Sequence, residues 1–134
     1  MTEREGQSVS VMSNDSPLYP QPTRELADLR TRLAQPPAVA FRAFSQSVFA
    51  DGALSAVTKQ LIAVAVAHVT QCPYCIRSHT HAALHHDATP EQIMEAIWVA
   101  AEMRAGGAYA HSNIALDEIQ HHRSETGTLD DRGR

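Results

Sequence analysis

A run of nine almost entirely apolar residues, LIAVAVAHV at positions 61–69, constrains the fold of this chain more than any other stretch. The run is far shorter than the roughly 18 residues that a membrane-spanning helix needs. It continues a helical pattern that begins after Ser55. A helix that is apolar on nearly every side lies at the centre of a protein or is buried against another subunit. The sequence therefore predicts a buried helix around which the other elements are arranged.

Helix start and stop signals divide the chain into further helical segments, and no segment shows the alternation of a strand. The expected starts are capping side chains, or prolines that fit a first turn: Thr23, Ser55, Cys72-Pro73 and Thr89-Pro90. The expected ends and interruptions are Pro36-Pro37, Asp51-Gly52, His86-Asp87 and Gly106-Gly107. We therefore expect an all-α protein.

The two ends of the chain differ from this helical middle. Residues 1–21 and 122–134 mix polar residues without helical spacing, which is typical of chain that buries too little apolar surface to fold. We expect a flexible N-terminal arm at 1–21, one helical domain at 22–121 and a flexible tail at 122–134.

Charge and composition exclude several classes of function. The chain has 134 residues, a net charge of −4 and no cluster of basic residues, so we expect no nucleic-acid partner. It has no apolar stretch of membrane length, and its start, MTEREGQSVSVMSNDS, lacks the apolar core of a signal peptide. We therefore expect a cytoplasmic protein without a membrane partner, in which a pair of cysteines is rarely a structural disulfide.

The stretch QCPYCIRSH at 71–79 carries the most distinctive chemistry. Cys72 lies at an expected helix start, where unpaired backbone N–H groups favour a thiolate. Its spacing from Cys75 lets the two sulfurs form a disulfide across one turn, and we expect that bond to form. His79 follows Cys75 by four residues, so both side chains share one helical face and can exchange a proton. A thiol pair with a base in line is the minimum for peroxide reduction or thiol–disulfide exchange.

Two other interpretations of the cysteines stay open. Both could be inert core residues, because free cysteine is among the most buried residue types. Alternatively, His68 and His79 together with the two cysteines supply the Cys2His2 ligands of tetrahedral zinc, on one nominal helical stripe. Pro73 is expected to break that stripe, and zinc fingers draw their ligand pairs from separated segments. We therefore favour the redox interpretation and expect no bound metal.

The other histidines and one tyrosine are secondary candidates. Those expected to be solvated or at the fraying end are His81, His85, His86, His121 and His122. His111 lies in the apolar run AGGAYAHSNIAL, where it either faces the site or a subunit contact or is a satisfied core histidine. Tyr74, between the cysteines, either shapes substrate access or packs.

The stretch KQLIAVAVAHVTQCPYCIRSHTHAALHHDATPEQIMEAIWVAAEMRAGGAYAH at 59–111 strongly resembles the carboxymuconolactone decarboxylase and alkylhydroperoxidase-D-like superfamily. The resemblance reaches back through FADGAL at 49–54. It implies an alkylhydroperoxidase-D-like helical bundle with the CxxC at a helix N-terminus, assembled into trimers or hexamers. It also implies a thiol peroxidase in which Cys75 attacks the peroxide, Cys72 resolves the intermediate and a partner re-reduces the disulfide. The decarboxylase branch lacks the CxxC pair, so the resemblance disfavours lactone decarboxylation.

The sequence departs from the redox-active branch at two positions. That branch has a Glu, eleven intervening residues, CxxC, three residues and His, and here the Glu position holds Gln60. An amide can orient His79 by hydrogen bonding but cannot take up its proton or stabilise an imidazolium by charge. The characterised peroxidase has a second histidine where this chain has Tyr74. Both changes imply a weaker or differently tuned peroxidase, in which His68 is an alternative base.

We therefore expect a cofactor-free, thiol-dependent hydroperoxide reductase. Cys75, Cys72 and His79 would be its catalytic residues, and Gln60 would orient the histidine. Its partners would be a small hydroperoxide and a reducing thiol or disulfide reductase. The alternatives are general thiol–disulfide exchange, or a redox-sensing helical assembly protein with weakened catalysis. The apolar runs LIAVAVAHV and IWVAA exceed what about 100 ordered residues can cover, so we also expect a homo-oligomer, a hexamer or trimer.

Overall fold

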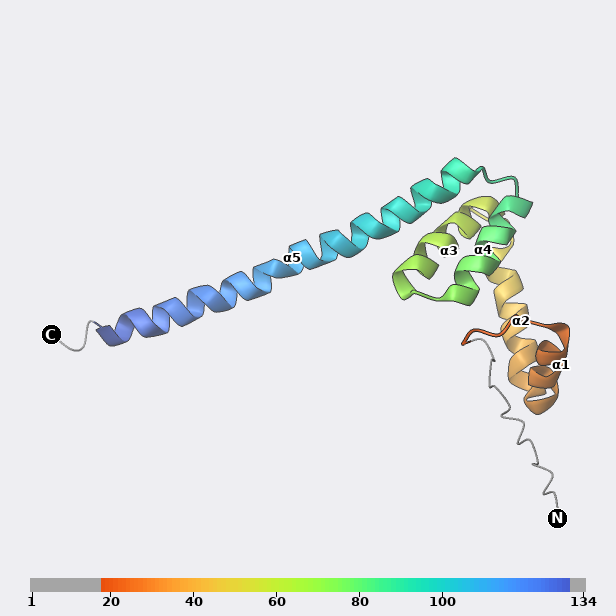
Figure 1. The fold of residues 1–134 in the computed structure, drawn as a ribbon, viewed down its shortest axis with the longest axis horizontal. Helices are drawn as coiled ribbons and strands as arrows, with labels where there is room; N and C mark the ends of the chain where they lie inside the picture. Colours follow the sequence, from red (N-terminus) through yellow and green to blue (C-terminus); the bar gives the residue numbers. More distant parts are fainter. Residues whose placement is uncertain (1–17, 131–134) are drawn as a thin grey trace, which may run out of the picture. The chain divides into compact units, whose positions relative to one another are not determined.

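The computed structural model describes residues 18–130, which form five α-helices and, within that range, no β-strand (Figure 1). The helices are α1 (Arg24–Leu33), α2 (Gln35–Phe49), α3 (Ala56–Thr70), α4 (Pro73–His85) and α5 (Pro90–Asp130). The prediction of an all-α protein is therefore confirmed. Most of the expected N-terminal arm, and residues 131–134 of the expected tail, lie outside the described residues.

The chain divides into two compact units, with the boundary at residues 41–42 inside α2. In the first unit, Thr23 caps α1 as predicted, because its hydroxyl accepts a hydrogen bond from the N–H of Leu26 at 3.3 Å. α1 ends at Leu33, just before Pro36 and Pro37, as predicted, and the two prolines lie in the first turn of α2. The N–H groups of a first turn have no intrahelical acceptor, so prolines there lose no hydrogen bond.

In the second unit, α3 contacts both α4 and α5, and α3 and α4 lie side by side (Figure 1). The core is centred on Val64 of α3, which is completely buried, with Ala83, Ala88 and Ile93 around it. These neighbours come from α4, from the α4–α5 connection and from the first turn of α5. The helix that contains LIAVAVAHV thus lies between α4 and α5, as expected of a central helix, but it is not buried on every side, because Ile62, Val66 and Val69 are each 42–52% exposed.

The predicted starts of α3 and α5 are also confirmed. Ser55 caps α3, because its hydroxyl accepts a hydrogen bond from the N–H of Thr58 at 3.3 Å. Thr89 and Gln92 form a reciprocal capping box at the start of α5. The Thr89 hydroxyl accepts from the N–H of Gln92 at 3.2 Å, and the Gln92 amide oxygen accepts from the N–H of Thr89 at 2.9 Å. These local hydrogen bonds fix the residue at which each helix begins.

α5 is one continuous helix, so the interruption expected at Gly106-Gly107 does not occur. A glycine inside a helix costs about 1 kcal/mol relative to alanine, and the strong helix formers of the preceding AAEMRA stretch offset that cost. The helix also includes residues 122–130, where we expected a flexible tail. Polar composition without periodicity was therefore not enough to end this helix.

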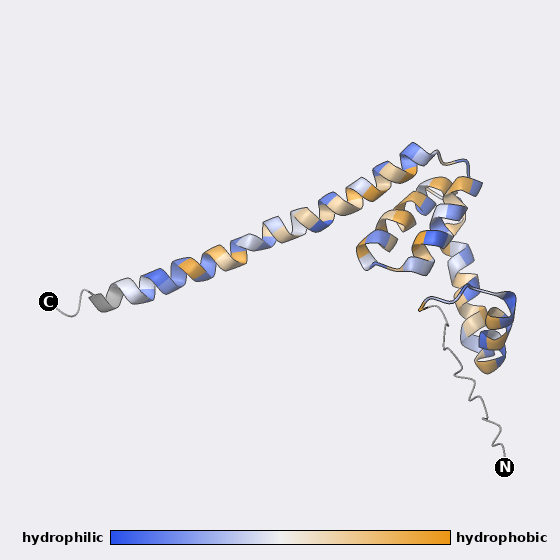
Figure 2. Cartoon of the chain, viewed as in Figure 1, coloured by the Kyte–Doolittle hydropathy of each residue, from blue (hydrophilic) through white to orange (hydrophobic). Residues whose placement is uncertain are grey.

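Large apolar side chains remain exposed along α5. Trp98 is 69% exposed and Tyr109 is 83% exposed. Every residue from 108 to 127 is exposed, and Figure 2 shows hydrophobic residues recurring along this part of the helix. Despite its length, neither α5 nor any other helix within residues 18–130 is apolar enough to cross a membrane.

We expect further copies of the chain to cover these side chains, because burying apolar surface gains about 25 cal/mol per Å². Sedimentation equilibrium at micromolar concentration should therefore give the mass of a trimer or hexamer. Trp98→Glu should shift the distribution toward smaller species, whereas Trp98→Phe, which keeps an apolar ring, should not. A folded monomer of the wild-type chain under these conditions would contradict the prediction.

Candidate functional site

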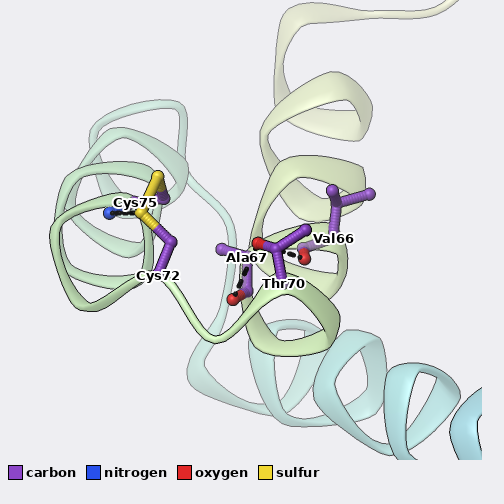
Figure 3. Close-up of a disulfide and its surroundings, with 5 residues drawn as sticks. All are labelled: Val66, Ala67, Thr70, Cys72 and Cys75. Atoms are coloured by element: carbon purple, nitrogen blue, oxygen red, sulfur yellow. Dashed lines mark hydrogen bonds between the residues drawn. A yellow bond between two sulfur atoms is a disulfide. The ribbon is translucent and has the colours of Figure 1, made fainter.

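A tight turn between α3 and α4 positions the two cysteines. Gln71 ends α3 in the left-handed conformation, with φ at 55°, and the N–H of Cys72 donates to the carbonyl of Ala67 at 3.1 Å. Cys72 is then the N-cap of α4 and Pro73 is its first residue, as predicted. The chain thus reverses within two residues and places the CxxC beside the end of α3 (Figure 3).

Cys72 and Cys75 form a disulfide across the first turn of α4, which confirms the predicted bond (Figure 3). Their Cα atoms are 5.2 Å apart, within the usual range for disulfides. The N–H of Cys75 also donates to Sγ of Cys72 at 3.2 Å. The sulfur of Cys72 therefore takes the place of the usual capping oxygen. In the reduced protein, it is the sulfur that the helix N-terminus would stabilise as an anion.

A hydrogen bond across the α3–α4 contact ties His79 to Gln60. Nδ1 of His79 lies 2.8 Å from Oε1 of Gln60, and Gln60 is buried, with 6% of the residue exposed. An amide oxygen only accepts hydrogen bonds, so Nδ1 carries the hydrogen and Nε2 keeps its lone pair. The ring is thereby held in the tautomer that offers a proton acceptor at Nε2.

The surroundings of His79 disfavour its charged form. Burial lowers the pKa of His79 below its ordinary value of 6.5. The ring of Phe49, at the end of α2, lies with its centroid 5.0 Å from that of His79 and excludes water from that side of the imidazole. The partner of Nδ1 is a neutral amide, so it supplies no negative charge that would raise the pKa again. His79 is therefore a neutral base at neutral pH.

Cys75 and His79 both line a cavity of about 420 Å³ formed by residues of α2, α3 and α4. This volume lies within the usual range for small-molecule sites. The rest of the lining is Lys59, Thr70 and six apolar residues: Val48, Phe49, Ile62, Ala63, Val66 and Ala67. Cys72 is not part of the lining, so of the two cysteines it is Cys75 that belongs to the cavity wall.

Thr70 lines the cavity near the CxxC, but its hydroxyl is already engaged. It donates to the carbonyl of Val66 at 3.1 Å and approaches that of Ala67 at 3.4 Å (Figure 3). The polar groups that remain for a ligand are therefore those of Cys75, His79 and Lys59.

The three auxiliary candidates from the sequence do not line this cavity. His68 bonds back to its own helix, with Nδ1 2.7 Å from the carbonyl oxygen of Val64. Tyr74 is half-exposed beside the cysteines, and His111 lies in the exposed part of α5. Within residues 18–130, no three His, Cys, Asp or Glu side chains are grouped so as to hold a metal ion.

Sequence reasoning missed the wall that α3 contributes to the cavity, and Lys59 above all. Lys59, Ala63, Val66 and Thr70 follow one another at spacings of three and four, so they form one stripe of the helix. That signal is present in the sequence, but a run that is apolar on nearly every side also predicts a central helix or one buried against another subunit. Phe49 gave no such signal, because only the fold brings the end of α2 to His79.

Residues 38–118 match the model of the carboxymuconolactone decarboxylase family. Two curated proteins are similar to the chain. The one called "Uncharacterized protein 4 in cox locus", from Paracoccus denitrificans, is 71% identical over 83 residues, which are 60% of this chain and 75% of that protein. An uncharacterized protein of Cupriavidus necator is 38% identical over 102 residues, which are 66% of this chain and 90% of that protein.

Solved structures share the fold. A protein from Methanobacterium thermoautotrophicum gives a TM-score of 0.61 at 31% identity, over 64% of this chain and 97% of that one. A carboxymuconolactone decarboxylase family protein from Legionella pneumophila gives a TM-score of 0.55 at 32% identity, over 72% of this chain and 86% of that one. A protein from Thermotoga maritima gives a TM-score of 0.58 at 23% identity, over 84% of this chain and 97% of that one. This similarity shows the fold alone. The fold implied by the sequence resemblance is confirmed.

We expect NMR titration to give His79 a pKa below 6.5 in the folded protein, because burial disfavours the imidazolium. The unfolded chain takes up this proton at the ordinary value. Between the two pKa values the unfolded state therefore binds more protons, and the free energy of unfolding decreases as the pH falls. Urea unfolding should show that wild type loses stability on acidification through pH 6.5 that His79→Gln does not lose. A folded-state pKa above 6.5 would contradict this account of the site.

Proposed function

Because this chain belongs to the carboxymuconolactone decarboxylase family, and because it carries a cysteine pair beside a cavity, we propose that it is a thiol-dependent hydroperoxide reductase. The Cys72–Cys75 couple would carry the electrons and His79 the proton. The observation that carries the proposal is that Cys75 and His79 line one cavity, while Gln60 holds the imidazole in the tautomer of a base. The substrate is a small hydroperoxide, and the electrons come from a reducing thiol partner.

The first step begins from the dithiol form. Nε2 of His79 takes the proton of the Cys75 thiol, and the thiolate attacks the terminal oxygen of the hydroperoxide. The O–O bond breaks as the S–O bond forms, and the departing alkoxide takes the proton from His79 and leaves as an alcohol. The peroxide is thereby reduced, and Cys75 is oxidised to a sulfenic acid.

The second step closes the disulfide. The Cys72 thiolate attacks Sγ of Cys75, the S–S bond forms, and the hydroxyl of the sulfenic acid leaves as water with the proton that Cys72 has released. The disulfide in the structure corresponds to this oxidised product. A partner dithiol then supplies two electrons and two protons, becomes a disulfide itself, and restores the two thiols.

Two effects compete in deciding which sulfur attacks. Cys72 gains most from the helix N-terminus, because it caps α4 and accepts the N–H of Cys75, an effect typically worth about 0.3–1 kcal/mol. Cys75 belongs to the cavity wall and has His79 one turn away on the same helix. Access to the substrate comes first, and of the two cysteines Cys75 is the one that lines the cavity. We therefore assign attack to Cys75 and resolution to Cys72.

Gln60 determines how strongly His79 can act as a base. Where the redox-active pattern has a glutamate, a carboxylate at Nδ1 would stabilise the imidazolium that forms during proton transfer. The amide of Gln60 keeps the hydrogen bond but adds no charge, and burial already disfavours the imidazolium. We therefore propose a peroxidase that is slower than one with the carboxylate, rather than an inactive one.

A second candidate is general thiol–disulfide exchange, because it ends in the same Cys72–Cys75 disulfide. Exchange with a protein disulfide needs an attacking sulfur that another protein surface can reach. Cys75 is instead partly buried, in a cavity of small-molecule size, which favours a small hydroperoxide. Turnover with a hydroperoxide and with a small-molecule disulfide, measured on the same preparation, separates the two functions.

Lactone decarboxylation changes no thiol oxidation state, so a disulfide would have no part in it.

Replacement of each cysteine by serine should separate the two roles. We expect Cys72→Ser to consume about one equivalent of hydroperoxide and to stop at a sulfenic acid on Cys75, because no resolving thiol remains. Cys75→Ser should barely react, because the attacking sulfur is gone. Trapping with dimedone followed by mass spectrometry locates the modified residue. A sulfenic acid on Cys72 of the Cys75→Ser protein would mean that Cys72 attacks the peroxide and Cys75 resolves the intermediate.

Gln60→Glu should raise hydroperoxide turnover, because a carboxylate at Nδ1 stabilises the imidazolium. A fully effective acid–base group contributes on the order of 10²–10⁴-fold, and we expect a gain below that range in a pocket adapted to an amide. The pKa of His79 should rise in the same variant. Gln60→Leu is the matched control, because it removes both hydrogen bond and charge and should lower turnover. Unchanged turnover in a folded Gln60→Glu protein would mean that proton transfer to His79 does not limit the rate.

A further inference from the structure

Lys59 places a positive charge at the cavity that the proposed reaction does not use. It lies on α3 one residue before Gln60 and is half-buried in the cavity lining. Its Nζ donates to the carbonyl oxygen of Ala50 at 2.6 Å, just beyond the end of α2. A Cβ built at Gly52 would lie 3.7 Å from Nζ, so the ammonium is held against the α2–α3 connection. Its position is therefore set by the protein rather than by solvent.

No carboxylate in the described part of the chain neutralises this ammonium. The ion pairs found among residues 18–130 join Arg24 to Asp28 and His121 to Asp117. Asp51 is close to Lys59 in sequence, but its carboxylate accepts the N–H of Ala56 at 2.7 Å at the start of α3. An ammonium has three donors, and Ala50 uses one of them. Lys59 therefore has donors and a charge available for an anion.

The remaining wall of the cavity is suited to a hydrocarbon chain. Six of its lining residues are apolar, and Ile62 and Val66 of α3 are both about half exposed toward it. Burying such surface is favourable by about 25 cal/mol per Å². One cation in an apolar cavity matches a ligand with one anionic group and an apolar body.

The reactive sulfur and the ammonium lie at different ends of this wall. Cys75 is nearest the α3–α4 turn, and His79 lies one turn, about 5.4 Å, further along α4. The hydrogen bond to Gln60 aligns His79 with the first turns of α3. The Lys59 ammonium meets the carbonyl oxygen of Ala50, the residue after Phe49, whose ring lies against that of His79, so the ammonium is at the His79 end of the wall. A ligand bound to Lys59 would therefore reach Cys75 with a group several carbon atoms away from its anionic end.

We propose that Lys59 binds the carboxylate of an acyl-chain hydroperoxide, whose chain lies along Ile62 and Val66 and whose peroxide group reaches Cys75. Lys59 is thus a specificity-determining residue, and the carboxylate takes no part in the redox steps described above. A single ammonium acts as a point charge and matches a singly charged carboxylate better than a phosphate, which usually receives several donors. The identity of the reacting group rests on the proposed function, whereas the carboxylate site does not.

The substrate preference tests this site during turnover. We would measure kcat/KM for a fatty-acid hydroperoxide and for its methyl ester, which differ only in the anionic group. Wild type should prefer the acid by roughly tenfold, the effect of one charged hydrogen bond at a partly exposed site. Lys59→Met should abolish that preference mainly through the KM of the acid, and Lys59→Arg should restore most of it. Arg42→Met, which removes an exposed positive charge outside the cavity lining, should leave the preference unchanged. Equal kcat/KM for acid and ester in wild type would overturn the proposal.

Binding without turnover keeps the two proposals distinguishable. Calorimetry on the oxidised wild-type protein should show decanoate binding roughly tenfold more tightly than decanol, with a preference that weakens as salt is added. Decanoate binding that requires Lys59, with no hydroperoxide turned over, would retain the carboxylate site and reject the peroxidase. Turnover of hydroperoxides with equal affinity for decanoate and decanol would retain the peroxidase and reject the carboxylate site. If neither compound binds because a second copy of the chain covers Ile62 and Val66, the proposal is wrong.

Discussion

The hydrogen bond between Gln60 and His79 is the constraint on which the rest of the site depends. It joins α3 to α4 next to the core and satisfies a polar group of each side chain. A buried amide left without a partner costs about 1–3 kcal/mol, so Gln60 is stable only when His79 faces it. Together with the packing of Ala83 in the core, that contact determines which face of α4 is turned toward α3. Cys75, one turn earlier on the same helix, is then held in the cavity wall, and the proton acceptor at Nε2 follows from the same bond.

The electrostatics of the site follow from this choice of partner. An amide opposite His79 leaves a neutral base, and burial near Phe49 keeps it neutral. The charge that remains at the cavity is then that of Lys59, whose Nζ is held by the carbonyl of Ala50. A site of this kind neither attracts nor repels a hydroperoxide group by charge at the sulfur. Under the proposed function, selection among substrates would fall instead on the apolar wall and on Lys59.

Local signals were enough to predict most helix starts. They did not predict the full extent of α5 or the contacts between helices. Thr23, Ser55 and Cys72 act as caps because capping depends on residues that are close in sequence. The interruption predicted at Gly106-Gly107 was wrong, because a glycine is tolerated inside a helix where its neighbours favour helix. The Gln60–His79 pairing could be anticipated only from the family pattern. Phe49 and Lys59 became visible only with the fold, since no local rule connects the end of α2 to α4.

The short span of the disulfide limits how far its oxidation state can affect the rest of the structure. Cys72 and Cys75 are three residues apart within one helical turn, so the bond encloses almost no chain and contributes little to the free energy of folding. Because the Cα atoms are within disulfide range in a regular first turn, closing the bond requires no unwinding of α4. Oxidation therefore leaves the course of α4 nearly unchanged. In the proposed redox cycle, a reductant would therefore recognise the oxidised form by direct contact with the two sulfurs rather than by a change in the course of α4.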